Sequence, residues 1–238
     1  MKLGLISDAH GNPMALRNCI RVLERRRVDE VYFLGDAVGY MPGVSEVLAI
    51  LQSSGAKCQK GNHEAMLLGE IPLREDKDLV YKIRSARERI SKEDLEFIRS
   101  WPDHRSIMVD DRSLLLVHGS PEDYLNGYVY SQEDLQLESL RAHDAVFMGH
   151  THYPFVADFH GHQVVNTGSC GLPRDQGDLS SFAIYDSSAH HTTILRLLFN
   201  SRAVIEYYGK DEIAPEVVEC LHRRSPDVFG VMAEQDAS

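Results

Sequence analysis

Five polar clusters constrain this chain more than any other feature, because each directly follows a short apolar run typical of a β-strand. The clusters combine Asp, His and Asn side chains with glycines, and they occupy residues 8–10, 35–39, 61–64, 118–119 and 149–152. In open α/β sheets, ligands bind outside the carboxyl ends of the strands. If these strands share one sheet, all five clusters meet at one edge of it.

The first sixty residues alternate between strand and helix. Asn12 followed by Pro13 is a typical helix start, and Gly55 is a typical residue at a helix end. We predict strands at residues 3–7, 30–34 and 56–59, and helices at 12–27 and 42–54. This βαβαβ order predicts parallel strands joined by right-handed crossovers.

The remainder of the chain changes from helical to strand-rich. Residues 64–101 read as a helical insertion, with a helix at 76–90, that covers an edge of the site. Later strands are predicted at 106–110, 113–117, 145–148, 155–159, 163–166, 182–186, 192–199 and 203–208, and helices at 131–141 and 213–224. The combination predicts an α/β fold, a four-layer α/β/β/α sandwich of two mixed β-sheets flanked by helices. That fold occupies residues 1–210, and a C-terminal helix and fraying polar tail follow at 211–238.

Composition disfavours several functional classes. The chain has 238 residues, enough for one domain, and no apolar run of 18 residues and no signal peptide, so we expect no membrane partner. Its net charge of −11 repels phosphate backbones, which disfavours nucleic acid as a partner and a nuclease function. Four cysteines without a CxxC pair disfavour a thiolate zinc site and predict a reducing, cytoplasmic location. The strands near 180–208 offer an edge for a homo-oligomer.

The clusters carry the donor types of a metal site. Residues two apart in extended backbone point to the same side, as Asp8 and His10 do and as His150 and His152 do. Carboxylate, imidazole and amide donors suit Mn, with Fe, Zn, Ni or Co as alternatives. The seven candidate ligands are Asp8, His10, Asp36, Asn62, His118, His150 and His152. Seven ligands exceed the need of one ion and suit two divalent ions about 3.5–4 Å apart, with one bridging carboxylate.

The order of these clusters resembles a known family. Asp8-x-His10, Gly35-Asp36-x-x-Gly39, Gly61-Asn62-His63-Glu64, His118-Gly119 and Gly149-His150-Thr151-His152 resemble the five signature motifs of the calcineurin-like metallophosphoesterase superfamily. The segment at 166–174 and the insertion at 76–101 are similar to those of its small bacterial phosphodiesterase branch. The resemblance covers about residues 1–210.

The resemblance implies a role for each residue. One ion is held by Asp8, His10 and His152, the other by Asn62, His118 and His150, and Asp36 bridges them. His63 lies near the leaving group as general acid, and Glu64, where the family often has Asp, orients it. The implied reaction is hydrolysis of a phosphodiester bond in a small phosphoester or nucleotide by a metal-bridging hydroxide.

Alternatives remain at this point. The same site suits a phosphomonoesterase or a nucleotide or dinucleoside polyphosphate hydrolase, and the same fold suits a non-catalytic scaffold. Asn166 and Arg174 are candidate substrate contacts. Asn166 would otherwise satisfy backbone groups at a strand end, and Arg174 would otherwise form a surface salt bridge. Glu64 is also a typical acid at a helix N-terminus.

Overall fold

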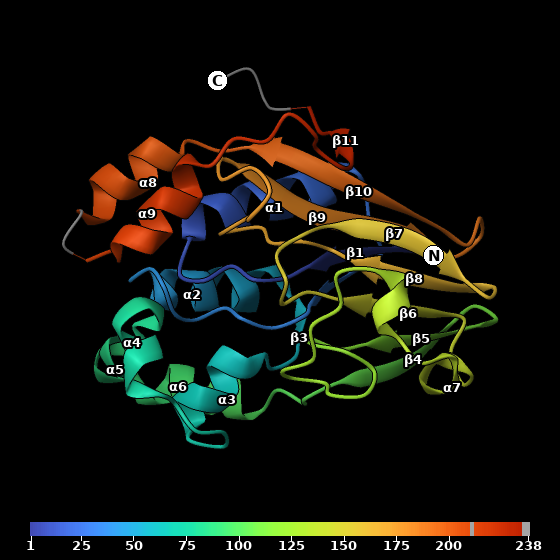
Figure 1. The fold of residues 1–238 in the computed structure, drawn as a ribbon, viewed down its shortest axis with the longest axis horizontal. Coiled ribbons are helices and arrows are strands. Elements are labelled where there is room, and N and C mark those ends of the chain that lie inside the picture. The colour runs from blue at the N-terminus through green and yellow to red at the C-terminus, as the bar shows by residue number, and fades with distance from the viewer. Residues whose placement is uncertain (210–211, 235–238) are drawn as a thin grey trace.

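Two β-sheets stacked face to face form the centre of the structure, a computed structural model that describes residues 1–209 and 212–234 (Figure 1). The first sheet has the order β11 (Val231–Met232), β10 (His191–Leu198), β9 (Leu179–Asp186), β1 (Lys2–Ile6), β2 (Glu30–Phe33), β3 (Lys57–Cys58). The second has the order β4 (Arg105–Val109), β5 (Arg112–Leu116), β6 (Ala145–Met148), β8 (His162–Asn166), β7 (Phe155–Phe159). Each sheet contains parallel and antiparallel pairs, which confirms the predicted pair of mixed sheets.

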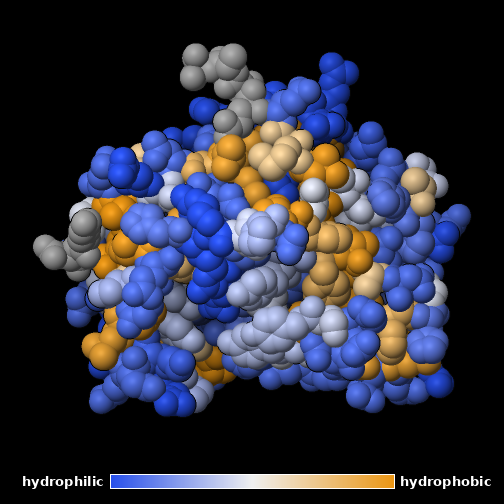
Figure 2. Space-filling view, turned by 45° about the horizontal axis from the view of Figure 1, so that its top comes forward, coloured by the Kyte–Doolittle hydropathy of each residue, from blue (hydrophilic) through white to orange (hydrophobic). Residues whose placement is uncertain are grey.

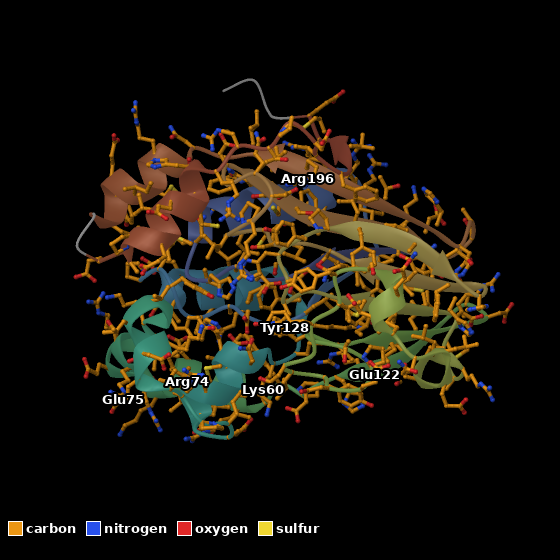
Figure 3. The ribbon with its side chains drawn as sticks, in the orientation of Figure 1. Lys60, Arg74, Glu75, Glu122, Tyr128 and Arg196 are labelled. Atoms are coloured by element: carbon orange, nitrogen blue, oxygen red, sulfur yellow. The ribbon has the colours of Figure 1, made fainter. Side chains whose placement is uncertain are left out.

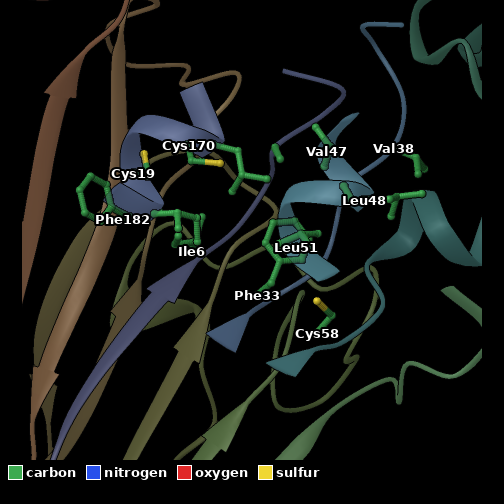
Figure 4. Close-up of a cluster of buried hydrophobic side chains, with 14 of the residues drawn as sticks. Ile6, Cys19, Phe33, Val38, Val47, Leu48, Leu51, Cys58, Cys170 and Phe182 are labelled. Atoms are coloured by element: carbon green, nitrogen blue, oxygen red, sulfur yellow. The ribbon is translucent and has the colours of Figure 1, made fainter. Parts of the chain in front are cut away.

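Strand β1 shows how the layers are built. Leu3 and Leu5 point into the core between the two sheets, where they share a cluster with Phe147. Ile6 points the other way, into the core beneath the helices. This alternation is the period of two that a strand buried on both faces requires. Figure 4 shows the helix-side core, in which Ile6 lies close to Cys19 of the first helix.

The βαβαβ unit at the N-terminus is confirmed. Strands β1, β2 and β3 are parallel, and they alternate with α1 (Pro13–Arg25) and α2 (Val44–Ser54). The Asn12 side chain accepts a hydrogen bond from the Ala15 N–H, which caps α1 as the sequence predicts. Helix α2 begins at Val44 rather than at Pro42, and it ends at Gly55, whose φ of 67° is left-handed.

The insertion is four short helices rather than a continuous helical segment. They are α3 (Asn62–Leu68), α4 (Glu75–Tyr81), α5 (Ile83–Arg89) and α6 (Lys92–Arg99). The helix predicted at 76–90 is wrong in one respect, because Lys82 adopts a left-handed φ of 58° and separates α4 from α5. Gly69 likewise ends α3 with a φ of 77°. In Figure 1 these helices gather at one side of the sandwich.

The strand predicted at 203–208 is wrong, because the segment forms helix α8 (Ser201–Tyr208). Its β-branched and aromatic residues favour a strand locally, but Val204 and Ile205 are adjacent and both buried. A strand would turn them to opposite faces, whereas one face of a helix buries both. They pack in the same cluster as Val217 of α9 (Pro215–His222), the predicted last helix.

A thin outer layer covers the second sheet. The helix predicted at 131–141 is wrong, because Leu135 is extended and separates the 3₁₀ turn η1 (Gln132–Asp134) from α7 (Leu137–Leu140). Leu135 is buried in the cluster that contains Met148, so packing on the sheet interrupts the helix. The four-layer α/β/β/α order is confirmed, with this layer mostly loop.

The C-terminal segment is partly ordered within the first sheet. Strand β11 pairs in parallel with Leu195 and Arg196 of β10, so the prediction of a fully fraying tail is wrong up to residue 234. Residues 210–211 and 235–238 lie outside the described part. Figure 2 shows a mainly hydrophilic face with several apolar patches. None of the helices in the described part is long and apolar enough to cross a membrane.

Candidate metal centre

The five polar clusters meet, although they come from two sheets. Strands β1, β2 and β3 belong to the first sheet, and β5 and β6 belong to the second, so the expectation of a single sheet edge is wrong. Because the sheets are stacked, the carboxyl ends of these strands lie together. His118, after β5, reaches Asp36, after β2, with 3.3 Å between Nε2 and Oδ2. The site therefore spans the two sheets.

One group of donors surrounds the side chain of Asp8. Its Oδ1 lies 3.2 Å from His152 Nε2 and 3.5 Å from His10 Nε2. The two imidazole nitrogens are 3.0 Å apart. Asp36 Oδ2 completes the group at 3.6 Å from His10 Nε2. These are four donor atoms around one point, as a single cation requires.

A second group shares Asp36 with the first. His118 Nε2 lies 3.3 Å from Asp36 Oδ2, 3.1 Å from Asn62 Oδ1 and 3.1 Å from His150 Nδ1. The same Asp36 oxygen therefore faces both groups. The seven residues predicted as ligands all lie here, and Asp36 occupies the position between the two groups.

Backbone carbonyls orient the imidazoles. The Nδ1–H groups of His10, His118 and His152 donate to the carbonyl oxygens of Val38 (3.1 Å), Leu34 (3.0 Å) and Leu172 (2.5 Å). With Nδ1 protonated, each Nε2 presents a lone pair to the centre. Two lone pairs facing each other at 3.0 Å, beside carboxylate oxygens, repel unless a proton or a cation lies between them. The donor set therefore fits a cation.

The backbone at the site is strained. Non-glycine residues rarely adopt a positive φ, yet Asp8 (57°), His10 (47°), Asp36 (61°), His150 (67°) and His152 (65°) all do. Each such residue costs about 1–3 kcal/mol and persists only where the surroundings enforce it. Five of the seven candidate ligands carry this cost, so strain concentrates where the donors converge.

Glu64 holds the loops that carry two of the ligands. Its buried carboxylate accepts hydrogen bonds from four backbone N–H groups, those of Asp36 (2.7 Å), Ala37 (2.8 Å), Val38 (3.1 Å) and Gly61 (2.8 Å). None of these hydrogen bonds involves the His63 ring. They therefore do not provide the orienting role that the resemblance implies for Glu64. Burial, aided by the Asp36 charge, raises the pKa of Glu64 to about 7.

The charges of the site favour a cation. Burial alone would lower the pKa of His118, but the charge and hydrogen bond of Asp36 raise it to about 9. Burial lowers the pKa of His150 to about 3, helped by the His118 charge. Burial alone would raise the pKa of Asp36, but the neighbouring imidazoles, His118 foremost, hold it well below its usual range. The ionised Asp36 carboxylate and the neutral imidazoles of His150 and His152 need no deprotonation to bind a metal, whereas His118 would release a proton on binding.

His63 lies beside this centre. Its backbone N–H donates to Asp36 Oδ1 (3.0 Å), and its Nε2 lies 3.8 Å from Asp36 Oδ2. The ring stacks on Tyr40 at 5.0 Å and contacts Tyr81 at 4.6 Å between centroids. Burial lowers the pKa of His63 to about 3. A Cβ on Gly39 would lie 2.3 Å from His63 Nδ1, so the glycine of the second cluster leaves room for this ring.

The sequence does not single out the two tyrosines that hold His63. Tyr40 directly follows Gly39, so its position beside a cluster was an available signal. Tyr81 ends α4 in the insertion, and nothing in its local sequence marks it.

The two candidate substrate contacts differ in their placement. Asn166 is fully buried, and its amide donates to the Gly149 carbonyl (2.6 Å) and accepts from the Gly168 N–H (2.9 Å). This is the backbone role considered as the alternative. Arg174 is half-buried and reaches the Tyr40 hydroxyl and the Thr151 carbonyl at 3.4 Å each. Burial lowers the pKa of His152, and the nearby Arg174 charge lowers it further, so this charge lies close to the site.

Fold and site together define a two-sheet sandwich whose buried Asp and His side chains form a candidate metal centre. The family model for the calcineurin-like phosphoesterase superfamily domain matches residues 1–190, and the chain belongs to that family. An uncharacterised protein of Methanocaldococcus jannaschii is 25% identical over 227 residues, which cover 89% of this chain and 93% of that protein.

Two solved structures are similar. The metallophosphoesterase from Sphaerobacter thermophilus has a TM-score of 0.76 and 25% identity, covering 93% of this chain and 98% of that one. A novel archaeal phosphodiesterase has a TM-score of 0.54 and 20% identity, covering 82% of this chain and 99% of that one. The second likeness concerns the fold alone.

Proposed function

We propose that this chain is a dinuclear-metal phosphodiesterase that acts on a small phosphoester or nucleotide. The observation that carries the proposal is the position of Asp36 Oδ2, 3.6 Å from His10 Nε2 and 3.3 Å from His118 Nε2. A single oxygen facing two donor groups is the arrangement that a bridging carboxylate needs. We propose Mn²⁺ as the native ion because the donors are oxygen and imidazole nitrogen.

The chain's own residues divide the work. Asp8, His10 and His152 would hold one ion, Asn62, His118 and His150 would hold the other, and Asp36 would join both. When bound, the two ions would make water acidic enough to supply hydroxide near neutral pH and would offset the charge of the phosphate. Glu64 would hold the loops that carry Asp36 and Asn62 in place, because its carboxylate accepts hydrogen bonds from the backbone N–H groups of Asp36 and Gly61.

His63 would serve the departing oxygen. Its burial favours the neutral ring in the free protein, since the pKa is about 3. A phosphate ester beside Nε2 would bring negative charge, which raises the pKa and lets the ring carry a proton. His63 would then donate that proton to the departing oxygen. Tyr40 and Tyr81 would keep the ring in place during the transfer.

The preference for diesters rests on two resemblances. The segment at 166–174 is similar to a loop of the small bacterial phosphodiesterase branch. An archaeal phosphodiesterase shares the fold. All seven ligand positions are kept, which argues against a non-catalytic scaffold.

Hydrolysis of bis(p-nitrophenyl) phosphate beside p-nitrophenyl phosphate, with Mn²⁺ and then with chelator, tests the proposal. Faster cleavage of the diester that stops with chelator would support it. Faster cleavage of the monoester would keep the metal site and assign a phosphomonoesterase. No cleavage of either ester, together with no metal bound after incubation with Mn²⁺, would overturn the proposal in favour of the scaffold.

A further inference from the structure

A cavity of about 180 Å³ opens directly beside the metal centre. Its wall includes two of the candidate ligands, Asn62 and His150, so a molecule in the cavity would touch the centre. Three further lining residues, Arg74, Lys77 and Tyr81, come from the insertion. Tyr128 also lines the cavity. Figure 3 shows Arg74 on the insertion and Tyr128 on the loop beside the second sheet.

Tyr128 lines the cavity with an aromatic ring, and Tyr130 lies next to Tyr128 outside the lining. The Tyr128 ring lies 4.1 Å from the His150 ring, and the Tyr130 ring lies 6.1 Å further on at an interplanar angle of only 12°. Both side chains are about half exposed, at 51% and 55%. Nearly parallel exposed rings that begin at a metal ligand form a surface on which a flat ring can stack.

Two cationic side chains line the cavity in a chain whose net charge is −11. Arg74 and Lys77 line the cavity, and Arg74 forms a two-pronged ion pair with Asp76 (2.7 and 3.0 Å). Lys77 makes no ion pair within 4 Å among the described residues, although its charge also acts on Asp76. Cations at the mouth of a site in an acidic protein raise the local concentration of anions.

The size of the cavity limits what it can hold. Pockets for whole drug-sized ligands measure about 300–1,000 Å³, so a volume near 180 Å³ suits one ring system. A polymer would need a longer groove and a more basic surface.

We propose that this cavity binds the base of a nucleotide substrate that carries at least two phosphates. The base stacks on Tyr128, Tyr130 extends that surface, and Lys77 with Arg74 contacts a second phosphate. The inference rests on the proposed function, because it takes the metal centre as the place where the reacting phosphate binds. On this proposal, the Tyr128 ring determines how tightly the base binds. The Lys77 charge determines the preference for a nucleotide that carries a second phosphate.

Equilibrium binding tests the inference without requiring catalysis. Calorimetry would compare ADP, AMP and ribose 5-phosphate on the full chain, with and without Mn²⁺. We expect ADP to bind most tightly and ribose 5-phosphate least. Tyr128→Leu should remove the advantage of AMP over ribose 5-phosphate, a loss of about 5- to 150-fold by the usual worth of base stacking. Tyr128→Phe, which keeps the ring, should retain that advantage.

The comparison of ADP with AMP tests the role of Lys77. Lys77→Met should remove the advantage of ADP over AMP, about 1.5- to 5-fold for an exposed charge pair. The matched control is Lys92→Met, which removes the same charge from a lysine outside the cavity and should retain the advantage.

Two results would overturn the inference. One is equal affinity of the unaltered protein for AMP and ribose 5-phosphate, or no binding of any of the three at millimolar concentration. The other is an equal loss for both ligands in Tyr128→Leu. Failure of the proposed function would look different, because the protein would then leave bis(p-nitrophenyl) phosphate intact whatever the nucleotides do.

Discussion

The metal centre and the cavity beside it differ in how firmly the fold determines them. All seven candidate ligands are buried, and backbone carbonyls or N–H groups fix most of them. The cavity is lined by Tyr128, which is 51% exposed, and by Arg74, whose side chain is 72% exposed. We conclude that the two sheets determine the reacting centre, whereas the insertion and one loop determine what reaches it.

The largest effect is expected at the shared carboxylate. Asp36→Asn removes a negative charge that faces both donor groups, so metal and activity should be lost together. A loss of several kcal/mol of charge stabilisation corresponds to about a thousandfold in rate. Metal analysis and hydrolysis of bis(p-nitrophenyl) phosphate check this, and full activity in the variant would refute the bridging role.

His63 tests whether the centre separates metal binding from proton transfer. His63→Ala should retain the bound metal, because His63 is not one of the seven candidate ligands, although its ring contacts the His10 ring at 4.8 Å between centroids and its Nε2 lies 3.8 Å from Asp36 Oδ2. Turnover should fall by about 10²- to 10⁴-fold, the usual contribution of general acid catalysis, and most for poor leaving groups. An equal loss for good and poor leaving groups would contradict the acid role.

Gly39 tests how tightly the centre is packed. Gly39→Ala places a Cβ 2.3 Å from His63 Nδ1 at a φ of 88°, where alanine is strained. The ring should move, and turnover should fall by about tenfold to a hundredfold, as expected for a misplaced catalytic group. Gly55→Ala is the matched control, because its left-handed φ of 67° costs similar strain while nothing lies within 4 Å of the added Cβ. Equal activity of the two variants would show that His63 has room to adjust.

Acid should destabilise the metal-free centre. The pKa values of His63 and His150 (about 3) and of His152 (about 4) lie below the unfolded value of about 6.5, so the unfolded chain binds protons first. Their contribution to stability is present above pH 6.5 and is lost as the pH falls toward 3–4. The pKa of His118, about 9, lies above the unfolded value. Its contribution to stability is therefore present below pH 6.5 and is lost as the pH rises toward 9. Urea unfolding of chelator-treated protein between pH 7 and 4 measures the loss, and a stability that stays constant would contradict it.

The smallest effect is expected in the cavity wall. Arg74→Ala removes an exposed ion pair with Asp76, and such pairs contribute little to the free energy of unfolding. Urea unfolding and metal analysis should both match the unaltered protein. A loss of metal in this variant would show that the insertion supports the centre, and the contrast between the two regions would fail.

The sequence predicts the centre well because its signals are local. Asn12 and Pro13 begin α1 as expected, and each ligand directly follows a strand. The sequence did not reveal that two sheets contribute ligands to the centre, because β5 and β6 pair with each other rather than with β1. Stacked sheets and one continuous sheet leave the same local pattern.

The features that the sequence did not predict depend on packing between segments that are far apart in the chain. The residues from Ala203 to Tyr208 favour a strand, yet burial against α9 makes them a helix. Glu64 reaches the loop of Asp36, 28 residues away, and no spacing reveals that contact. Tyr128 and Tyr81 likewise meet the site only in three dimensions.

Anomalous diffraction from crystals grown with Mn²⁺ is the most direct test of a shared carboxylate between two cations. We predict two peaks on either side of the Asp36 carboxylate, about 3.5–4 Å apart, one near Asp8 and one near Asn62. A single peak, or two peaks that leave Asp36 uncoordinated, would contradict the dinuclear centre.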